Sequence, residues 1–442
     1  MLIFIVLITL EKGLVYVHGK LPDLIKEYLE YSFAKIDGVK FIVANSVILE
    51  GVNLPVDSLF ILNTYSLNIK GLTNLIGRVN RLNEVFSEED KYLKKLSPKI
   101  HFINSEKYNG IRGKMENKIK LLRNGFFKDE VKNPLLLNFN FEEFEQKLND
   151  KVESGGSESS KIKALSEVQD LQDRERFIIF GEDTPSYRIM RILSESELST
   201  NYQNYRDVFR LIESRVHEVM ASPEWLGEDV INKIYLLFIH GLEENICNYE
   251  FARLKQAKAR DFYRMFIDKL HRFSLKEHIS DMVEYFYSIR NQQSGRDFYI
   301  GQSYGEKSKF NEDRNSYGQN VFIDLASKTH KELVNIALVK IKIESDFVSY
   351  ILNQYVTILY ELELISEGDY NKHIYGTENR KNSDFVKVGF SGSLVNRLDR
   401  DGQIKNLTLG EFGDVICKDE FREYMRNKDA LMKFEVEKFI EL

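Results

Sequence analysis

The sequence predicts an α/β domain with a parallel sheet at the N-terminus, followed by a larger, mostly α-helical region. Residues 1–106 alternate short β-branched or aromatic runs with stretches of helical periodicity. These apolar runs are nearly continuous, which is typical of parallel strands covered on both faces. Beyond about residue 162 the apolar residues recur mostly at helical spacing, and the whole chain holds only six prolines.

Four strands and a crossover helix are expected in the first 106 residues. The predicted helix, residues 21–34, carries Leu24, Ile25, Tyr28, Leu29 and Phe33 at helical spacing. Strand, helix and strand in alternation indicate an α/β layer domain. The predicted strands are Gly13–Val17, Lys40–Ala44, Ser58–Asn63 and Lys99–Ile103.

Composition and charge restrict the class of protein. Hydrophobic residues make up 43% and charged residues 29%, which is ordinary for a globular protein. The net charge of −6 requires any nucleic-acid contact to come from a local basic face. Cys247 and Cys417 lie far apart and the histidines lack ligand spacing, so we expect no metal cluster and a reduced, cytoplasmic protein. The apolar residues 2–10 are too short to span a bilayer, and a buried strand or core helix without membrane contact is expected.

The sequence divides into three segments by composition. Residues 1–108 form the α/β part, and residues 109–164 form a connector that contains a Ser/Gly-rich linker, 153–160. Residues 165–442 form the helical region, interrupted by a polar, loop-like stretch at 291–320. The helices expected here include Tyr205–Met220, Asp229–Leu242 and Phe251–Leu270.

Two adjacent segments of the α/β part carry chemistry. In Phe41–Pro55 a buried strand runs into a polar turn and then Glu-Gly-Val-Asn-Leu-Pro, so polar residues follow the carboxyl end of a strand, where α/β sheets bind ligands. In Leu72–Arg81 two arginines stand three residues apart, and a helix would place both on one face. Arg78 and Arg81 together suit the oxygens of a transferring phosphate, and Gly77 before them allows close approach of a ligand or backbone.

These segments resemble motifs V and VI of superfamily 2 helicases of the DEAD/DEAH-box type, Ski-type branch. Glu50–Pro55 is similar to the end of motif V, and Asn74–Arg81 is similar to motif VI. A third similarity, Val17–Pro22, resembles the family's His-Gly-x-Leu-Pro segment. The three occur in the family's order and spacing over about residues 13–105. The resemblance implies a second RecA-like helicase lobe at residues 1–108.

The resemblance also implies a role for each matched residue. Arg78 and Arg81 would be arginine fingers for the γ-phosphate. The nucleotide would lie beside Gly51, Asn53 and Gly77. The nucleic-acid backbone would be contacted by Asn45, Ser46, His18 and Gly19. This sequence departs from the family in two places, with Asn45 where threonine is usual and Asn80 where motif VI has glycine.

The ATP-binding half of such a motor is not recognised in these residues. Gly13–Lys20 imitates a P-loop, but its glycines are one residue too far apart and Leu21 stands where Ser or Thr should bind Mg²⁺. The pairs Asp129-Glu130 and Asp419-Glu420 follow motif VI, whereas the family's acidic motif precedes it. We interpret neither as the end of an apolar strand.

The leading hypothesis is therefore the C-terminal part of an ATP-dependent helicase that acts on DNA or RNA. ATP and Mg²⁺ would bind only with a partner lobe, which could be a separate chain, and this chain would not hydrolyse ATP alone. The alternative is a non-catalytic nucleic-acid-binding or adaptor protein, for example of a defence system, that uses the lobe as a scaffold.

Four weaker signals have structural alternatives. Gly301–Gly305 matches a nucleophile elbow but lacks a following packed helix, so a plain turn is favoured. Residues 254–273 interleave cations with aromatics, and we favour an amphipathic helix with a buried aromatic face over strand tracking. Residues 386–398 are either a nucleic-acid contact or a packing helix. Trp225 is interpreted as a packing anchor.

Overall fold

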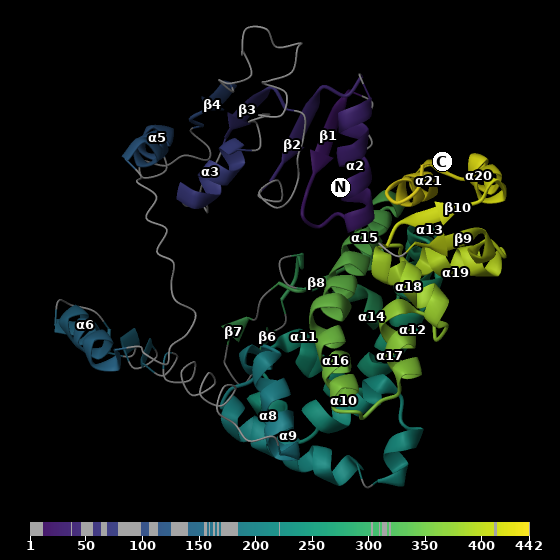
Figure 1. Ribbon diagram of the computed structural model, residues 1–442. Coiled ribbons are helices and arrows are strands. Elements are labelled where there is room, and N and C mark those ends of the chain that lie inside the picture. Colours follow the sequence, from purple (N-terminus) through teal and green to yellow (C-terminus); the bar gives the residue numbers. More distant parts are fainter. Residues whose placement is uncertain are drawn as a thin grey trace. The chain divides into compact units, whose positions relative to one another are not determined.

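The computed structural model of the chain forms two compact units (Figure 1). One unit comprises Met1–Lys128, Leu275–Glu344 and Asp414–Leu442; the other comprises Asp129–Ser274 and Ser345–Gly413. The region predicted at 165–442 thus contributes to both units, while the boundaries at 108 and 164 stay predictions. The structure describes residues 12–36, 38–45, 56–62, 69–77, 99–105, 114–124, 140–153, 157, 158, 160, 161, 164, 165, 168, 184–220, 222–301, 304–308, 310–311, 316–317, 320–410 and 413–441.

The first unit begins with a parallel β-α-β element. Strand β1 (Leu14–Val17) pairs with β2 (Phe41–Ala44), and helix α2 (Asp23–Lys35) connects them. Val15 and Val17 on β1 pack with Leu21 and Leu29 in a small core. Gly13 starts β1 with a φ of +74°, and a Cβ there would lie 2.5 Å from the carbonyl oxygen of Gly38, so glycine is required for this close approach.

A second parallel β-α-β element follows. Strand β3 (Ser58–Ile61) pairs with β4 (Lys99–Phe102), and helix α3 (Ile69–Gly77) lies between them in sequence. Ile61, Leu72 and Met115 form the buried centre of this element. Met115 begins helix α5 (Met115–Asn124), so the residues after β4 return to cover α3.

The structure confirms the N-terminal pattern of the sequence in part. All four predicted strands form within a residue or two of the expected bounds, and both strand pairs are parallel. Figure 1 shows α2 alongside β1 and β2. The described strands form two separate two-stranded sheets, each with its own small core. A parallel α/β pattern followed by abundant helix is therefore shown, and a single RecA-like sheet is not.

Later stretches of the chain complete the first unit. Two helices and two short strands share a core that includes Phe286, Ile300, Leu325 and Ala337. The predicted loop 291–320 contains helix α14 and short strands. The later helices and strands of the first unit are α13 (Leu275–Ile289), α14 (Gln293–Arg296), β5 (Phe298–Tyr299), β6 (Phe310–Asn311), β7 (Ser316–Tyr317), β8 (Phe322–Ile323), α15 (His330–Phe347, to Glu344 in this unit), β10 (Val415–Cys417), α20 (Asp419–Arg426) and α21 (Ala430–Glu437).

Helix α2 is held by two of these later segments. The ring of Phe434 on α21 packs against Tyr28 and Tyr31 with centroid separations of 5.4 and 5.0 Å. The Tyr31 hydroxyl donates to a Glu437 carboxylate oxygen at 3.0 Å. Near the start of α2, the Lys342 ammonium of α15 lies 3.0 Å from an Asp23 carboxylate oxygen. The crossover helix of the first β-α-β element is thus fixed at both ends.

The second unit is helical around a large aromatic and aliphatic core. Phe251 and Tyr355 are fully buried and stack with centroids 4.2 Å apart. Trp225 is buried, and its indole nitrogen donates to the Leu364 carbonyl at 2.9 Å, which confirms the packing-anchor interpretation. The main elements are α6 (Phe141–Glu153), α8 (Pro185–Glu195), α9 (Tyr205–Met220), α10 (Val230–Phe238), α11 (Tyr249–Ala252), α12 (Ala257–Arg272), α16 (Asn353–Glu361), α17 (Glu367–Tyr375), α18 (Arg380–Val388), α19 (Gly392–Arg400) and β9 (Leu407–Leu409).

Two predicted helices differ from those observed. The helix expected at Phe251–Leu270 is broken, because Gln256 takes an extended conformation before α12 begins. The helix expected at Asp229–Leu242 already ends at Phe238, whereas Tyr205–Met220 is confirmed. None of the helices in the described ranges combines the length and apolar character that crossing a membrane requires.

A buried ion pair in α15 yields the first prediction. Lys340 and Glu344 are paired one helical turn apart and are only 4% and 1% exposed. Lys340→Met leaves a buried carboxylate without its cation and should destabilise the first unit by about 3–5 kcal/mol. The double variant Lys340→Met/Glu344→Leu removes both charges and should restore the stability of the parent chain or exceed it.

The measurement is urea unfolding followed by circular dichroism, with the fluorescence of Trp225 reporting the second unit separately. A single variant that is as stable as the double variant would contradict the prediction.

Candidate functional site

The residues that follow β1 and β2 meet at one edge of the first parallel pair. Val17 pairs with Ala44 in the sheet register, so His18 and Asn45 are the next residues on adjacent parallel strands. Gly19 continues from His18 into the turn that leads to α2. The structure therefore brings together three of the predicted site residues at the carboxyl edge, which is the usual ligand-binding edge of a parallel sheet.

The imidazole of His18 is held in a defined orientation at this edge. Its Nδ1 accepts a hydrogen bond from the Lys20 backbone nitrogen at 3.2 Å, and the ring stacks on Tyr16 at 6.2 Å. Partial burial, and then the charge of Lys20, lower the pKa of His18. At neutral pH the ring is therefore uncharged. Because Nδ1 accepts a hydrogen bond, the single ring proton is on Nε2, which can donate.

Helix α3 leads directly to the predicted arginine pair. Leu72 anchors the helix in the core, and the helix ends at Gly77, which is exposed. A Cβ at Gly77 would meet nothing within 4 Å among the described residues, so packing does not require glycine there. The other predicted site residues lie outside the described residues: Arg78, Arg81, Gly51, Asn53 and Ser46.

The structure accounts for the P-loop imitation and for the pair Asp419-Glu420, whereas the pair Asp129-Glu130 lies outside the described residues. Strand β1 occupies four of the five residues between Gly13 and Gly19, so this segment is not a phosphate-binding loop. The statement that neither acidic pair follows an apolar strand is wrong for Asp419-Glu420, which come one residue after β10. There Asp419 is exposed in the first turn of α20 and pairs with Arg422 at 3.0 Å.

The aromatic and basic segment 254–273 consists of the end of a 3-10 turn, Arg253–Lys255, and the core helix α12. Tyr263 and Phe266 are 0% and 1% exposed, so they cannot stack on nucleotide bases. The Arg260 guanidinium lies over the Tyr235 ring at 4.0 Å and donates to the Leu254 carbonyl. The structural interpretation of this segment is confirmed, because its aromatics pack inward and this arginine serves the local fold.

Two other weak signals also belong to the fold. After Gly305 the described residues form the short strand β6 rather than the helix that a nucleophile elbow needs, and Ser303 lies outside the described residues. In the segment 386–398, Ser391 caps α19 by accepting from the Leu394 backbone nitrogen at 3.1 Å. Leu394, Val395 and Leu398 of α19 are buried, so the helix has a packing face, and the nucleic-acid contact of this segment stays a prediction.

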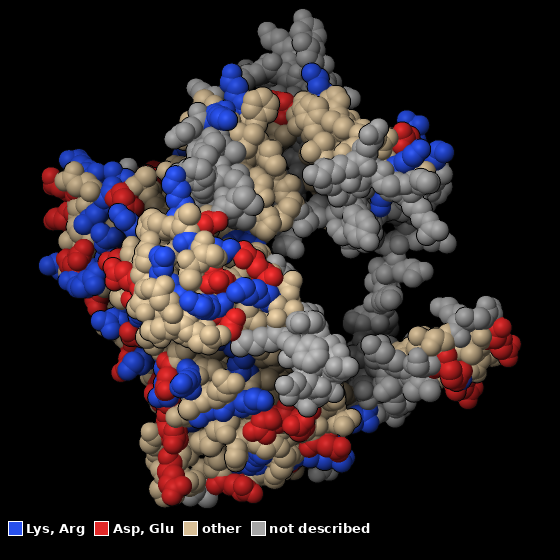
Figure 2. Space-filling view, turned by 180° about the vertical axis from the view of Figure 1, so that it is seen from behind, with Lys and Arg blue, Asp and Glu red and all other residues tan. Residues whose placement is uncertain are grey.

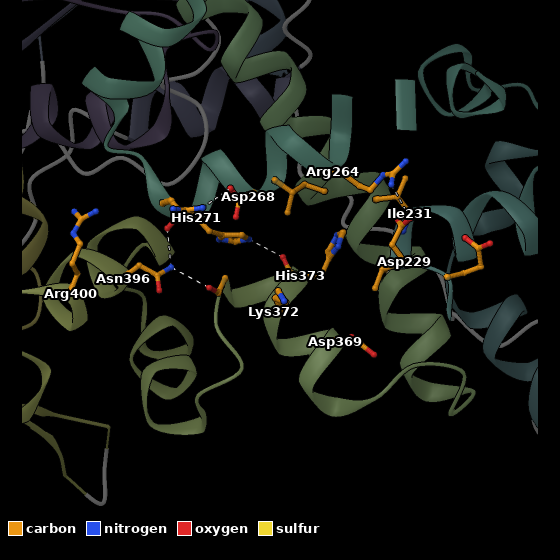
Figure 3. Close-up of a pocket in the computed structure, with 15 residues that line it drawn as sticks. Asp229, Ile231, Arg264, Asp268, His271, Asp369, Lys372, His373, Asn396 and Arg400 are labelled. Atoms are coloured by element: carbon orange, nitrogen blue, oxygen red, sulfur yellow. Dashed lines mark hydrogen bonds and ion pairs between the residues drawn. The ribbon is translucent and has the colours of Figure 1, made fainter. Parts of the chain in front are cut away.

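A cavity in the second unit brings together residues that no sequence pattern indicated. It has a volume of about 520 Å³ and lies among α10, α12, α17 and α19 (Figure 3). Its residues are separated by as many as 172 positions, so no local spacing could reveal it. The lining residues are Glu228, Asp229, Val230, Ile231, Arg264, Ile267, Asp268, His271, Arg272, Asp369, Lys372, His373, Gly376, Asn396 and Arg400.

Two histidines form part of the cavity wall. The His271 Nε2 donates to the His373 carbonyl oxygen at 2.8 Å, and burial lowers the pKa of His271. Burial, and then the neighbouring His271, lower the pKa of His373 to about 3. Both rings are therefore uncharged at neutral pH.

Charges on the face shown in Figure 2 are mixed rather than separated among the described residues. Figure 2 shows lysines and arginines interspersed with aspartates and glutamates on the face that it presents. Within the described ranges, no three His, Cys, Asp or Glu side chains come together as a metal site. Cys247 is exposed and Cys417 is buried, and both are free thiols.

Comparison with known proteins does not assign the chain to a family. No family model, no curated protein and no solved structure matches it.

The buried histidine predicts how stability depends on pH. The unfolded imidazole titrates near 6.5, whereas folded His373 titrates near about 3, so unfolding takes up a proton between these values. Stability is fully present above pH 6.5 and falls as the pH decreases toward 3. Between pH 7.5 and 5.5, His373 alone should lower the free energy of unfolding by about 1.4 kcal/mol.

Urea unfolding of the second unit, followed by Trp225 fluorescence at both pH values, measures this difference. His373→Phe should show a pH-dependent loss smaller by about 1.4 kcal/mol. An unchanged pH dependence in the variant would exclude His373 as its source.

Proposed function

We propose that this chain is the C-terminal part of an ATP-dependent nucleic-acid helicase. The observation that carries the proposal is the order of elements in the first unit. Two parallel β-α-β elements follow one another, and each segment that resembles a helicase motif begins within one of their strands or helices.

The correspondence is positional. The His-Gly segment follows β1, the motif V segment begins in β2 and continues from Asn45, and the motif VI segment begins within α3 and continues past Gly77. In a parallel sheet the carboxyl ends of adjacent β-strands share one edge. A motor lobe needs its contacts with the nucleotide and with the nucleic acid at such an edge. The described register supports this arrangement for His18 and Asn45.

In this proposal residues 1–108 are the second RecA-like lobe. Arg78 and Arg81 would stabilise charge on the γ-phosphate when ATP is bound between two lobes. The phosphate cradle and Mg²⁺ ligands would come from a lobe with Walker A and Asp-Glu motifs, on another part of the polypeptide or on a partner chain. Phosphoryl transfer depends almost wholly on positioning and charge stabilisation, so these 442 residues alone would not hydrolyse ATP.

The contact with the nucleic-acid strand would be made by uncharged hydrogen-bond donors. The Nε2 proton of neutral His18 and the amide of exposed Asn45 can each donate to a phosphate oxygen. Contacts with the backbone position a strand without reading its sequence. The helical second unit would guide the strand or dock partners, and its helix α12 would not act by base stacking, because its central aromatics are buried.

Single-strand binding tests the strand contact. Asn45→Ala should weaken binding of a single-stranded oligonucleotide by about fivefold, the value of one neutral hydrogen bond. Asn117→Ala on the exposed face of α5 is the matched control and should leave affinity unchanged. Fluorescence anisotropy with DNA and RNA strands gives both constants. Equal affinities for the two variants would remove Asn45 from the interface.

ATP hydrolysis tests the arginine pair. The chain should be inactive alone and should support hydrolysis with a first lobe, such as one encoded by the upstream reading frame. Arg81→Ala should then reduce kcat by about a thousandfold or more. The exposed Arg123 at the end of α5 provides the control, since Arg123→Ala should change the rate by less than about twofold.

Retention of activity by Arg81→Ala would contradict the arginine-finger role. Strand binding without any reconstituted hydrolysis would favour the adaptor alternative.

A further inference from the structure

A lysine outside the predicted site lies in the turn that follows β1. Lys20 comes after His18 and Gly19, and its backbone nitrogen donates to the His18 Nδ1 at 3.2 Å. The Leu21 backbone nitrogen donates to the His18 carbonyl at 2.9 Å, and the Leu21 side chain is buried. The turn is therefore fixed by its own hydrogen bonds and by the core, and it holds Lys20 at the edge where β1 and β2 end.

The Lys20 ammonium is not neutralised by a carboxylate. Among the described residues, none of the ion pairs includes Lys20, and the next acidic residue along the chain, Asp23, is paired with Lys26 at 2.9 Å and with Lys342 at 3.0 Å. The Lys20 side chain is partly exposed, so solvent and solutes can reach its charge. An accessible lysine that the fold leaves without a counter-charge can serve as a point charge for a phosphate.

The ammonium is held instead over an aromatic ring from a later part of the first unit. The Lys20 Nζ lies 5.6 Å from the centroid of the Tyr304 ring, which is within the range of a cation–π interaction. Tyr304 is also partly exposed, and it packs against the core that contains Phe286 and Ile300. The ring is therefore anchored in this core while it contacts the lysine.

Backbone contacts fix the position of this tyrosine. The Glu306 backbone nitrogen donates to the Phe322 carbonyl at 2.9 Å. A Cβ on Gly305 would lie 2.2 Å from the Val321 backbone nitrogen, so glycine is required for the two segments to pass this closely. The residues that follow Tyr304 are thus locked against β8 and its preceding residue, and the ring has a defined place beside the turn after β1.

The edge combines this cation with uncharged donors. The Nε2 of neutral His18 can donate there, and so can the amide of Asn45. A cation beside neutral donors matches phosphate oxygens, which carry charge and accept several hydrogen bonds. At least half of the hydrogen bonds between proteins and DNA go to phosphates and sugars. Because the whole chain has a net charge of −6, attraction of a nucleic-acid strand requires a local cation such as Lys20.

We propose that Lys20 is the cationic phosphate contact of this edge, and that Tyr304 is the positioning residue that holds its ammonium there. The phosphate belongs to the backbone of a single-stranded nucleic acid, so this inference rests on the function proposed above. The later segment of the first unit then completes the binding edge as well as the fold of the N-terminal element.

Salt-dependent strand binding tests the role of Lys20. Fluorescence anisotropy of the full chain with a single-stranded oligonucleotide gives the dissociation constant at a series of salt concentrations. Lys20→Gln should weaken binding by about tenfold at low salt. It should also reduce the slope of log K against log salt by about 0.7, the value of one phosphate contact on a single strand. Lys40→Gln is the matched control, because Lys40 is exposed at the opposite end of the same sheet, and should change the affinity by less than about twofold.

A double-mutant cycle tests the role of Tyr304. Tyr304→Leu should weaken binding by about two- to fivefold, whereas Tyr304→Phe keeps an aromatic ring and should retain the parent affinity. In the Lys20→Gln background Tyr304→Leu should have no further effect, because the ring acts only through the ammonium. If the urea midpoint shows that Tyr304→Leu does not fold, Tyr304→Met replaces it with the same expectations.

The inference and the proposed function would fail in different ways. If Lys20→Gln matches Lys40→Gln in affinity and salt slope while Asn45→Ala still weakens binding, the role of Lys20 is overturned and the proposed function stands. Equal losses from Tyr304→Leu in both backgrounds would show a merely structural tyrosine. Calorimetric binding of inorganic phosphate that depends on Lys20, with unchanged oligonucleotide affinity in Lys20→Gln, would overturn the proposal in favour of a small-anion site. A parent chain that binds neither DNA nor RNA strands would overturn both.

Discussion

The parallel pairing of β1 and β2 is the constraint on which the proposed binding edge of the sheet depends. Two parallel strands cannot be joined by a tight turn, so the chain must cross back over the sheet, usually as a helix of about a dozen residues. Helix α2 makes this crossover between β1 and β2. As a result both strands end at the same edge, and His18 and Asn45 become neighbours although 26 residues of chain separate them.

The crossover helix in turn depends on distant parts of the chain. Two short strands and one helix bury little apolar surface, and the core around Val15 and Leu29 is small. The aromatic contacts of Phe434 and the ion pair of Asp23 with Lys342 add support from α21 and α15. The residues that carry the motif resemblance are therefore not an independent structural unit, because their framework is completed by residues 275–344 and 414–442.

Local patterns in the sequence predicted local structure well. The β-branched runs indicated all four N-terminal strands, and helical spacing located α9 at both ends. The break at Gln256 was not predicted, because the apolar spacing continues through it and one residue's extended conformation depends on tertiary packing. The aromatic residues of α12 could not be interpreted from composition alone. The same rings suit a buried core or a face that binds single-stranded nucleic acid, and only their burial decides between the two.

The candidate sites likewise divide into one that local sequence patterns predict and one that depends on tertiary packing. His18, Gly19 and Asn45 could be assigned because motif order places them after strands, and strand ends converge by geometry alone. The cavity around His373 could not be predicted, because α10, α12, α17 and α19 contribute two to five lining residues each. The contact of the His271 ring with the His373 carbonyl is a property of the folded arrangement and leaves no signature in sequence spacing.

The alternation of the chain between the two units has a consequence for biosynthesis. The first unit starts near the N-terminus, yet α21, which packs on α2, is made only when residues 430–437 leave the ribosome. The second unit likewise waits for residues 345–413. Neither unit is complete before its last segment has been made, and closing the first unit brings together residues 406 positions apart, such as Tyr31 and Glu437. Such long-range closure slows folding and prolongs the period in which chaperones would be needed.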